Sequence, residues 1–458
     1  MKFKTINPAT EEVIKEYSTQ PKEEVLNSTK KAENAFETWG NFSVEERAPY
    51  FKNLAVILRQ NREKYARLIT TEMGKPIKQS IAEVEKCAWT SDFYSENASK
   101  WLKDEEVKAD GKKHIIAYEP LGVILAVMPW NYPFWQAFRF AIPTLLAGNT
   151  AILNHSNVVP ECALAIEEAF TEAGFPEYVF KTVIADHESV SELAKSDIIQ
   201  GISLTGSTQA GQRIAEIAGK NLKKVVLELG GSDAFIVLDD ADSEFAAKGA
   251  VFGRTNNAGQ SCIAAKRFIM TEKKAKEFSK VFAEMTSKLI VGNPVDDKTD
   301  VGPLVNKEVV LQIDEFVKDA VSKGAKVLCG GKRKEGKGFF YLPTVLSNTN
   351  HDMKCVKEEV FGPVAPIIIV KDEKEAIKTA NSLEFGLGAS VWTKDEKKGL
   401  QIARKLKAGS VFVNSFVKSD ARMPFGGIKK SGIGRELSKF GLREFTNVKG
   451  INIYEEKK

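Results

Sequence analysis

Cys262 is the residue best suited to nucleophilic chemistry in this sequence, since a thiolate is a strong nucleophile. It stands in Gly259-Gln260-Ser261-Cys262-Ile263, a small and turn-prone approach that predicts a thiol presented on a loop or at a helix start. At a helix start, the dipole would lower the pKa of the thiol. The alternative is a buried structural cysteine, which is how we interpret Cys87, Cys162, Cys329 and Cys355.

Two other polar residues interrupt or follow apolar runs. Glu228 comes near the end of a predicted strand, directly before Leu229 and two glycines. Burial would raise the pKa of this carboxyl and suit it to act as a base, unless it only bonds a nearby backbone amide. Asn131 lies between Pro129 and Pro133 after a buried strand, where a rigid amide suits an oxyanion hole. A turn asparagine is the alternative for Asn131.

A glycine-containing segment over 201–211 predicts a strand, a turn and a helix. Gly206 and Gly211 flank the helix start, and free backbone amides there suit a pyrophosphate. Ser207 would add a hydroxyl donor. The spacing is not G-x-G-x-x-G, so an ordinary capped strand-to-helix turn remains the alternative.

The elements that must position these residues alternate along the chain. Helical spacing predicts that the first hundred residues are helical, over 24–39, 44–73 and 77–102. Strand patterns then alternate with helices and indicate a parallel sheet in a doubly wound α/β fold, with strands at 123–127, 150–153, 182–184, 201–204 and 224–229. A second α/β stretch follows Gly231, with helices at 241–254 and 309–323 and strands at 267–271 and 366–370. The tail over 446–454 is expected to form an arm that adds a strand to a neighbour's sheet.

Composition excludes several classes of function. A net charge of +5, spread over 66 basic and 61 acidic residues with no basic stripe, argues against nucleic acid. The five cysteines form no C-x-x-C pair, which fits a reducing cytoplasm. The four histidines are widely separated, so no metal site is expected. The longest apolar stretch, 121–130, is too short to cross a membrane.

Asn131, Gly206, Glu228 and Cys262 occur in one chain in this order, and here the sequence resembles the aldehyde dehydrogenase superfamily, most closely its succinate-semialdehyde branch. The likeness continues in 358–363, 409–414 and 424–432 and in the 34-residue step from Glu228 to Cys262. The resemblance implies a Rossmann-type cofactor domain (1–100 and 121–230), an α/β catalytic domain (231–440) and a small β oligomerisation arm (101–120 and 441–458). It also implies a cytoplasmic homodimer or homotetramer.

The resemblance implies a mechanism as well. Cys262 attacks the aldehyde, the Asn131 side chain and the Cys262 amide hold the oxyanion, and Glu228 activates the water that hydrolyses the thioester. The cofactor is NADP or NAD. The residues expected around it are Trp130 and Leu229 near the nicotinamide, Gly206, Ser207 and Gly211 near the pyrophosphate, Glu359 and Phe361 at the nicotinamide ribose end, and Asn154 and Asn157 near the adenosine.

Asn154 and Asn157 depart from the family pattern. The family usually places a lysine at position 154, and NAD-preferring members often carry a glutamate at position 157. Losing the lysine weakens phosphate binding, whereas lacking the glutamate removes a repulsion. These opposing effects favour acceptance of NADP slightly.

The substrate expectation depends on Arg139 and Ser419, which match carboxylate-binding positions of the succinate-semialdehyde branch. A guanidinium fork suits a carboxylate, although an arginine on a surface helix is the alternative. The second arginine of some members is Asn256 here. We therefore expect oxidation of succinate semialdehyde to succinate. Lactaldehyde and glyceraldehyde remain open as substrates.

Two rival functions follow from the same residues. A CoA-acylating enzyme would transfer the acyl group from Cys262 to coenzyme A, but Glu228 favours hydrolysis. A non-catalytic binding or structural relative would have lost its nucleophile, whereas Cys262, Glu228 and Asn131 are all present.

Overall fold

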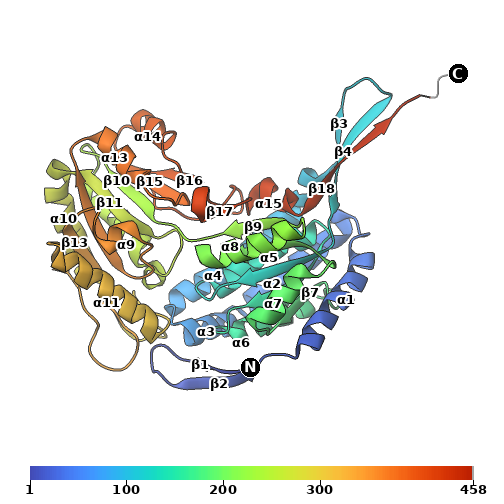
Figure 1. Cartoon of the computed structure of the whole chain (residues 1–458), viewed down its shortest axis with the longest axis horizontal. Helices are drawn as coiled ribbons and strands as arrows, with labels where there is room; N and C mark the ends of the chain where they lie inside the picture. The colour runs from blue at the N-terminus through green and yellow to red at the C-terminus, as the bar shows by residue number, and fades with distance from the viewer. Residues whose placement is uncertain (456–458) are drawn as a thin grey trace.

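The structure is a computed structural model that describes residues 1–455. It begins with a hairpin of β1 (Lys2–Ile6) and β2 (Val13–Ser18), joined antiparallel and seen at the lower edge of Figure 1. The expectation that this stretch is helical is therefore wrong for residues 2–18. Both strands leave most of their residues exposed or half-buried, so little hydrophobic alternation marks them in the sequence.

Four helices follow the hairpin: α1 (Lys22–Trp39), α2 (Val44–Gln60), α3 (Arg62–Met73) and α4 (Ile77–Leu102). The single helix predicted over 44–73 is interrupted at Asn61, whose backbone leaves the helical region. Ser43 starts α2 with a capping box, and Gly74 ends α3 in a left-handed conformation. The bounds of α4 agree with the prediction.

A six-stranded sheet forms the centre of the first half of the molecule. Its strand order is β17-β9-β8-β5-β6-β7, and all neighbours are parallel except β17. The strands are β5 (Val123–Met128), β6 (Thr150–His155), β7 (Phe180–Val183), β8 (Ile199–Thr205), β9 (Lys224–Glu228) and β17 (Gly432–Ile433). The connecting helices are α5 (Pro133–Leu146), α6 (Pro160–Glu172), α7 (His187–Lys195) and α8 (Thr208–Lys220). The predicted parallel, doubly wound arrangement is confirmed.

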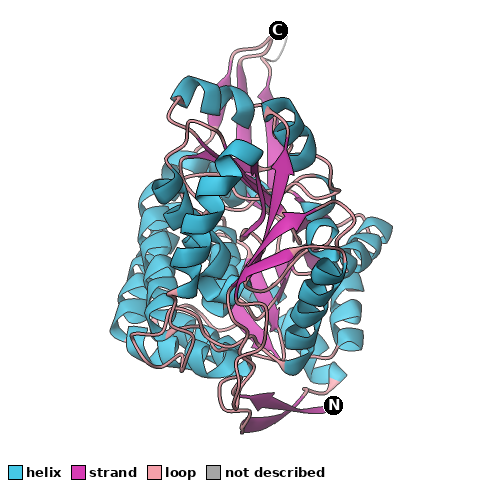
Figure 2. Cartoon of the chain, turned by 90° about the vertical axis from the view of Figure 1, so that its left-hand side faces the viewer, coloured by secondary structure: helices cyan, strands magenta, loops and turns pink. Residues whose placement is uncertain are grey.

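A seven-stranded sheet forms the second half, in the order β12-β13-β14-β11-β10-β15-β16. Its strands are β10 (Asp233–Val237), β11 (Ala265–Thr271), β12 (Lys326–Cys329), β13 (Thr344–Thr349), β14 (Val364–Val370), β15 (Gly388–Trp392) and β16 (Ser410–Val413). Its helices are α9 (Ser243–Thr255), α10 (Glu272–Ser287), α11 (Lys307–Ser322), α12 (Lys354–Lys357), α13 (Glu373–Ala380) and α14 (Glu396–Ala403), and the 3₁₀ turn η1 (Asn256–Gly259) precedes β11. The chain then returns to the first half through the 3₁₀ turn η2 (Lys429–Ser431), β17 and α15 (Ser438–Glu444), which packs against α4 and α5. Helices and strands form separate layers in Figure 2.

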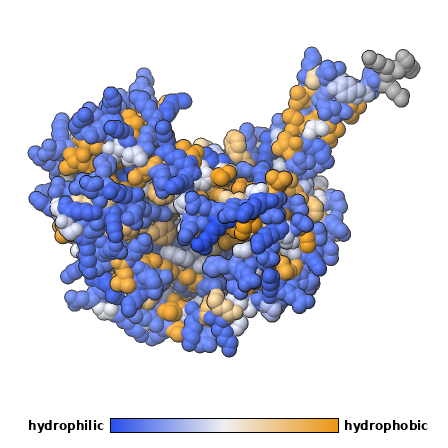
Figure 3. Space-filling model, viewed as in Figure 1, coloured by the Kyte–Doolittle hydropathy of each residue, from blue (hydrophilic) through white to orange (hydrophobic). Residues whose placement is uncertain are grey.

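A three-stranded arm projects from the body (Figure 1). It consists of β3 (Glu105–Val107), β4 (Lys113–Pro120) and β18 (Thr446–Ile453), with β18 antiparallel to β4 of the same chain. Hydrophobic side chains lie along it in Figure 3, and Val448 and Ile453 are exposed. The last three residues of the predicted arm, 456–458, lie outside the described residues. Within residues 1–455, no helix is both long and apolar enough to cross a membrane.

Candidate active site

A cavity of about 660 Å³ is lined by residues from both halves of the molecule. Cys262 is on its wall, together with polar side chains from α4 and α5 and apolar side chains from α9 and the segment after β16. The residues that the following paragraphs use are Lys86, Trp135, Arg139, Cys262, Ser419 and Phe425. The nucleophile proposed from sequence is therefore open to a small molecule.

Cys262 lies in the turn between η1 and β11, not at a helix start. Lys266 holds this turn, because its Nζ donates to the carbonyl oxygens of Ser261 (3.0 Å) and Cys262 (2.6 Å). Burial raises the pKa of the thiol to about 12, while the cations Arg139 and Lys266 act to lower it. Of the two positions left open from the sequence, the loop is therefore correct and the helix start is wrong, so side-chain cations, and not a helix dipole, oppose the effect of burial on the thiol.

Asn131 is tied directly to the approach to the thiol. Its Nδ2 donates to the carbonyl oxygen of Gln260 at 2.9 Å, and its Oδ1 accepts from Gln136 Nε2 at 3.1 Å. The Asn131 carbonyl also accepts from Asn257 Nδ2 at 2.8 Å. These bonds hold the Asn131 side-chain amide against Gln260, which precedes Cys262 by two residues. One of the two Nδ2 hydrogens takes no part in these bonds. A rigid amide donor is what an oxyanion site requires.

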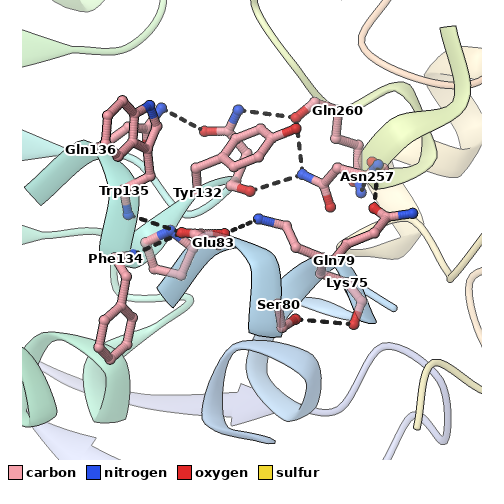
Figure 4. Close-up of polar contacts among 12 residues, drawn as sticks. Lys75, Gln79, Ser80, Glu83, Tyr132, Phe134, Trp135, Gln136, Asn257 and Gln260 are labelled. Carbon is pink, nitrogen blue, oxygen red and sulfur yellow. Dashed lines mark hydrogen bonds and ion pairs between the residues drawn. The ribbon is translucent and has the colours of Figure 1, made fainter. Parts of the chain in front are cut away.

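A buried ion pair supports the loop that carries Asn131 (Figure 4). Glu83 accepts the backbone N–H groups of Phe134 (3.0 Å) and Trp135 (2.9 Å) at the first turn of α5. The same carboxylate pairs with Lys75, whose ammonium lies 3.6 Å from the ring centroid of Tyr132. Glu83 of α4 and Lys75, which precedes α4, thereby anchor the end of this loop where α5 begins, and the start of α5 is satisfied by a charge that complements its dipole.

Glu228 ends β9 with its side chain buried, and neither carboxylate oxygen has a hydrogen-bond partner within residues 1–455. The alternative of a glutamate bonded to a nearby amide is therefore wrong. Burial raises the pKa of Glu228 well above its usual range, and the nearby Glu436 carboxylate raises it further. A Cβ on Gly426 would lie 2.6 Å from Glu228 Oε1, so only a glycine leaves room there.

The segment after β8 combines a capped turn with an open surface. The Ser207 hydroxyl accepts from the Ala210 N–H at 3.2 Å and starts α8, and Gly206 donates to the Glu228 carbonyl at 3.0 Å. A Cβ on Gly206 would meet nothing closer than 3.5 Å, whereas one on Gly211 would lie 2.5 Å from Leu229. Gly206 therefore leaves an uncrowded helix start, and Gly211 lets α8 pack closely on Leu229.

The other predicted cofactor residues lie in two groups. Trp130 and Phe361 meet edge to face with ring centroids 5.7 Å apart. Glu359 accepts the Gly231 N–H at 3.1 Å and lies 3.2 Å from Lys266 Nζ. The start of α8 suits the phosphates of a dinucleotide, and the half-buried ring pair suits its nicotinamide ring. The Glu359 carboxylate can accept hydrogen bonds from its ribose hydroxyls.

The adenosine-side positions end β6. Asn154 accepts the Ala185 N–H at 3.1 Å through its side-chain oxygen, and Asn157 lies in the following turn, half-buried. Neither brings a charge to this edge of the sheet.

The sequence profile described as "Aldehyde dehydrogenase family" matches residues 1–451. The chain belongs to the aldehyde dehydrogenase family. The predicted enzyme class, an NAD(P)-dependent aldehyde dehydrogenase, is thereby confirmed.

Several relatives of this aldehyde dehydrogenase family member are similar over almost the whole chain. A protein of Synechocystis named "Probable succinate-semialdehyde dehydrogenase", NADP(+), is 46% identical over 451 residues, covering 98% of this chain and 99% of that protein. An Escherichia coli succinate semialdehyde dehydrogenase, NAD(P)+, is 43% identical, covering 98% and 97%. The crystal structure of succinic semialdehyde dehydrogenase from Streptococcus pyogenes with NADP+ has a TM-score of 0.96 and 35% identity, covering 99% and 100%.

The two predicted substrate residues of this family member both line the cavity, but their surroundings differ. The Arg139 guanidinium is buried, forms an ion pair with Glu436 and lies 4.6 Å from the ring centroid of Phe425. The Ser419 hydroxyl oxygen accepts from Trp135 Nε1 (3.1 Å) and from Lys86 Nζ (2.7 Å). The alternative of a surface arginine is therefore wrong for Arg139.

Four residues of the site were not identified from sequence: Lys86, Gln260, Lys266 and Glu436. Lys266 and Arg267 interrupt the otherwise apolar stretch from Ala264 to Met270, and this was an available signal for Lys266, since a buried ammonium needs partners. Lys86 and Glu436 carry no such local signal, because only the fold brings them to Ser419 and Arg139.

Proposed function

We propose that this protein oxidises succinate semialdehyde to succinate with NADP or NAD, through a thioester on Cys262. The observation that supports this most is the joining of three elements around one cavity. The turn that carries Cys262 and a cationic wall that suits a carboxylate both line the cavity, and the Asn131 amide is joined to that turn through Gln260. Relatives named for this activity, at 43–46% identity, give independent support.

The chain's residues account for each chemical step. Arg139 and Lys266 favour the thiolate of Cys262, which attacks the aldehyde carbon. The free Asn131 N–H and the Cys262 backbone N–H stabilise the oxyanion that forms on the former carbonyl oxygen. When bound, the nicotinamide dinucleotide supplies the acceptor for the hydride that leaves this carbon. The Glu228 carboxylate then takes a proton from water, whose oxygen attacks the thioester and releases the acid and the thiolate.

The dinucleotide would be held at three places: its pyrophosphate, its nicotinamide end and its adenosine. Gly206 and Ser207 at the start of α8 would bind the pyrophosphate, with Gly211 allowing the close packing on Leu229. Trp130 and Phe361 would enclose the nicotinamide end with Glu359 on the ribose. Asn154 and Asn157 would lie at the adenosine, where the missing carboxylate leaves a 2′-phosphate unopposed.

We also propose the division of labour that the sequence suggested. Residues 1–100 and 121–230 would bind the cofactor, 231–440 would supply the thiol, and 101–120 with 441–458 would join copies into a cytoplasmic homodimer or homotetramer. The projecting arm with exposed Val448 and Ile453 supports the last point.

The test is reduction of NADP+ and NAD+ by the purified full chain with succinate semialdehyde, butanal, lactaldehyde and glyceraldehyde. We expect the highest kcat/KM for succinate semialdehyde, and free succinate as product even with coenzyme A present. Cys262→Ala should abolish the activity, whereas the matched Cys329→Ala, outside the cavity, should keep it. Comparable kcat/KM values for all four aldehydes would refute the substrate assignment.

A further inference from the structure

Among the cations that line the cavity, Arg139 and Lys86 are the two that are largely buried, and their surroundings differ. Arg139 is already compensated: Glu436 pairs with it, the Phe425 ring covers it, and its Nη2 lies 3.4 Å from the Thr205 hydroxyl. A guanidinium paired with a buried carboxylate adds little net positive charge for a substrate to meet.

Lys86 has no such counterion. In the part of the chain that the structure describes, no carboxylate lies within ion-pair distance of its ammonium. The two acids nearest in electrostatic effect, Asp420 and Glu83, are bound to other cations, Arg422 and Lys75. The ammonium instead lies 3.9 Å from the ring centroid of Trp135, on the cavity wall.

Ser419 completes this arrangement through its hydroxyl hydrogen. Its oxygen accepts two bonds, from Lys86 Nζ at 2.7 Å and from Trp135 Nε1 at 3.1 Å, which use both lone pairs. The hydroxyl hydrogen has no acceptor among residues 1–455 and is left to donate. Lys86 and Ser419 therefore present an ammonium and an O–H group side by side to the cavity.

We propose that Lys86, together with the Ser419 hydroxyl, is the principal binding site for the carboxylate of the substrate, and that Arg139 is held by Glu436 in a supporting role. This inference rests on the proposed function, because it names the group that distinguishes an anionic aldehyde from a neutral one. A carboxylate placed there supplies the counterion that Lys86 lacks and the acceptor that Ser419 lacks.

The charge state of Lys86 adds a pH dependence. Burial and the Arg139 cation together lower its pKa to about 8, although Cys87, Asp420 and Glu83 act to raise it. The ammonium is therefore retained at neutral pH and lost as the pH rises through about 8. The KM for succinate semialdehyde should then rise above this pH, whereas the KM for butanal, which has no carboxylate, should not follow it.

The experiment compares selectivity in three full-length variants. The readout is kcat/KM for succinate semialdehyde divided by kcat/KM for butanal. Lys86→Met keeps the aliphatic packing on Trp135 and removes the charge, and Lys86→Gln is a second variant in case the first does not fold. Lys100→Met is the matched control, since Lys100 is an exposed lysine of the same helix, α4.

We expect the selectivity ratio to fall about 10- to 100-fold in both Lys86 variants, mainly through KM, and to stay at the wild-type value in Lys100→Met. A Lys86 variant that folds and keeps the wild-type ratio overturns the role of Lys86 and leaves the proposed function standing. A wild type that shows no preference for succinate semialdehyde over butanal overturns both proposals. A fall in kcat for both aldehydes with an unchanged ratio also overturns the binding role.

Discussion

Replacing Glu228 with glutamine separates the two chemical stages of the proposed reaction. Neither carboxylate oxygen of Glu228 has a hydrogen-bond partner among the described residues, 1–455, so the isosteric amide removes the base without breaking a bond seen there. General-base catalysis contributes roughly 10²- to 10⁴-fold, which corresponds to about 3–5 kcal/mol at the transition state of deacylation. Formation of the thioester does not use this base and should keep its rate.

Stopped-flow measurement of NADPH or NADH with Glu228→Gln should therefore show a burst close to one equivalent per active site, followed by a steady rate lower by that factor. Rapid quenching and intact mass spectrometry should find the acyl group on Cys262. The wild-type steady rate should rise with pH as Glu228 loses its proton, at a pH above the usual range of a glutamate, and this rise should be absent in the variant. A variant without a burst, or with an unchanged steady rate, would refute the role of Glu228.

The remaining predictions concern the oxyanion site, the buried ion pair and stability. Asn131→Ala should lower the burst rate about 10²- to 10³-fold, because it removes the amide donor held by Gln260; a burst at the wild-type rate would exclude this role. Glu83→Gln should lower the free energy of unfolding by about 3–5 kcal/mol in urea titrations, since it leaves Lys75 buried without a counterion; the partly exposed Glu85→Gln is the control, and equal losses would contradict the argument. The pKa of Glu228 in the folded state is raised above its ordinary value of 4.5. The protonated carboxyl therefore costs the folded protein no stability below pH 4.5, but folding becomes less favourable as the pH rises from there towards the folded pKa. The Tm of Glu228→Gln minus the Tm of the wild type should therefore be larger at pH 8 than at pH 5. An equal difference at the two pH values would argue against a buried, unpaired carboxylate.

Much of the fold was predictable because its strands are short buried runs separated by turns. The prediction for α4 was correct at both ends, and β5 differs by one residue, since strong periodicity or continuous burial marks them. The break at Asn61 was not predictable, because apolar residues continue at helical spacing on both sides of it. The β1–β2 hairpin was missed because it buries few residues.

The site divides in the same way. Cys262, Glu228 and Asn131 each have a local signal, and the resemblance to a family gave them roles. The backbone around Cys262 was not predictable, because Asn257 and Ala258 both take positive φ angles of 52° that no glycine announces. Lys86 bonds Ser419 and Glu436 pairs with Arg139, and each pair is separated by about three hundred residues in sequence. Only the tertiary structure therefore shows which of these charges has a counterion.

The short strand β17 has a consequence for synthesis of the chain on the ribosome. Residues 432–433 protect β9, which is otherwise the last strand of its sheet, and Ser431 accepts the Leu229 N–H at 3.0 Å. A nascent chain that has emerged only as far as β9 therefore keeps an open hydrogen-bonding edge for some two hundred further codons. During that interval the β9 edge is open to pairing with a strand of a neighbouring nascent chain.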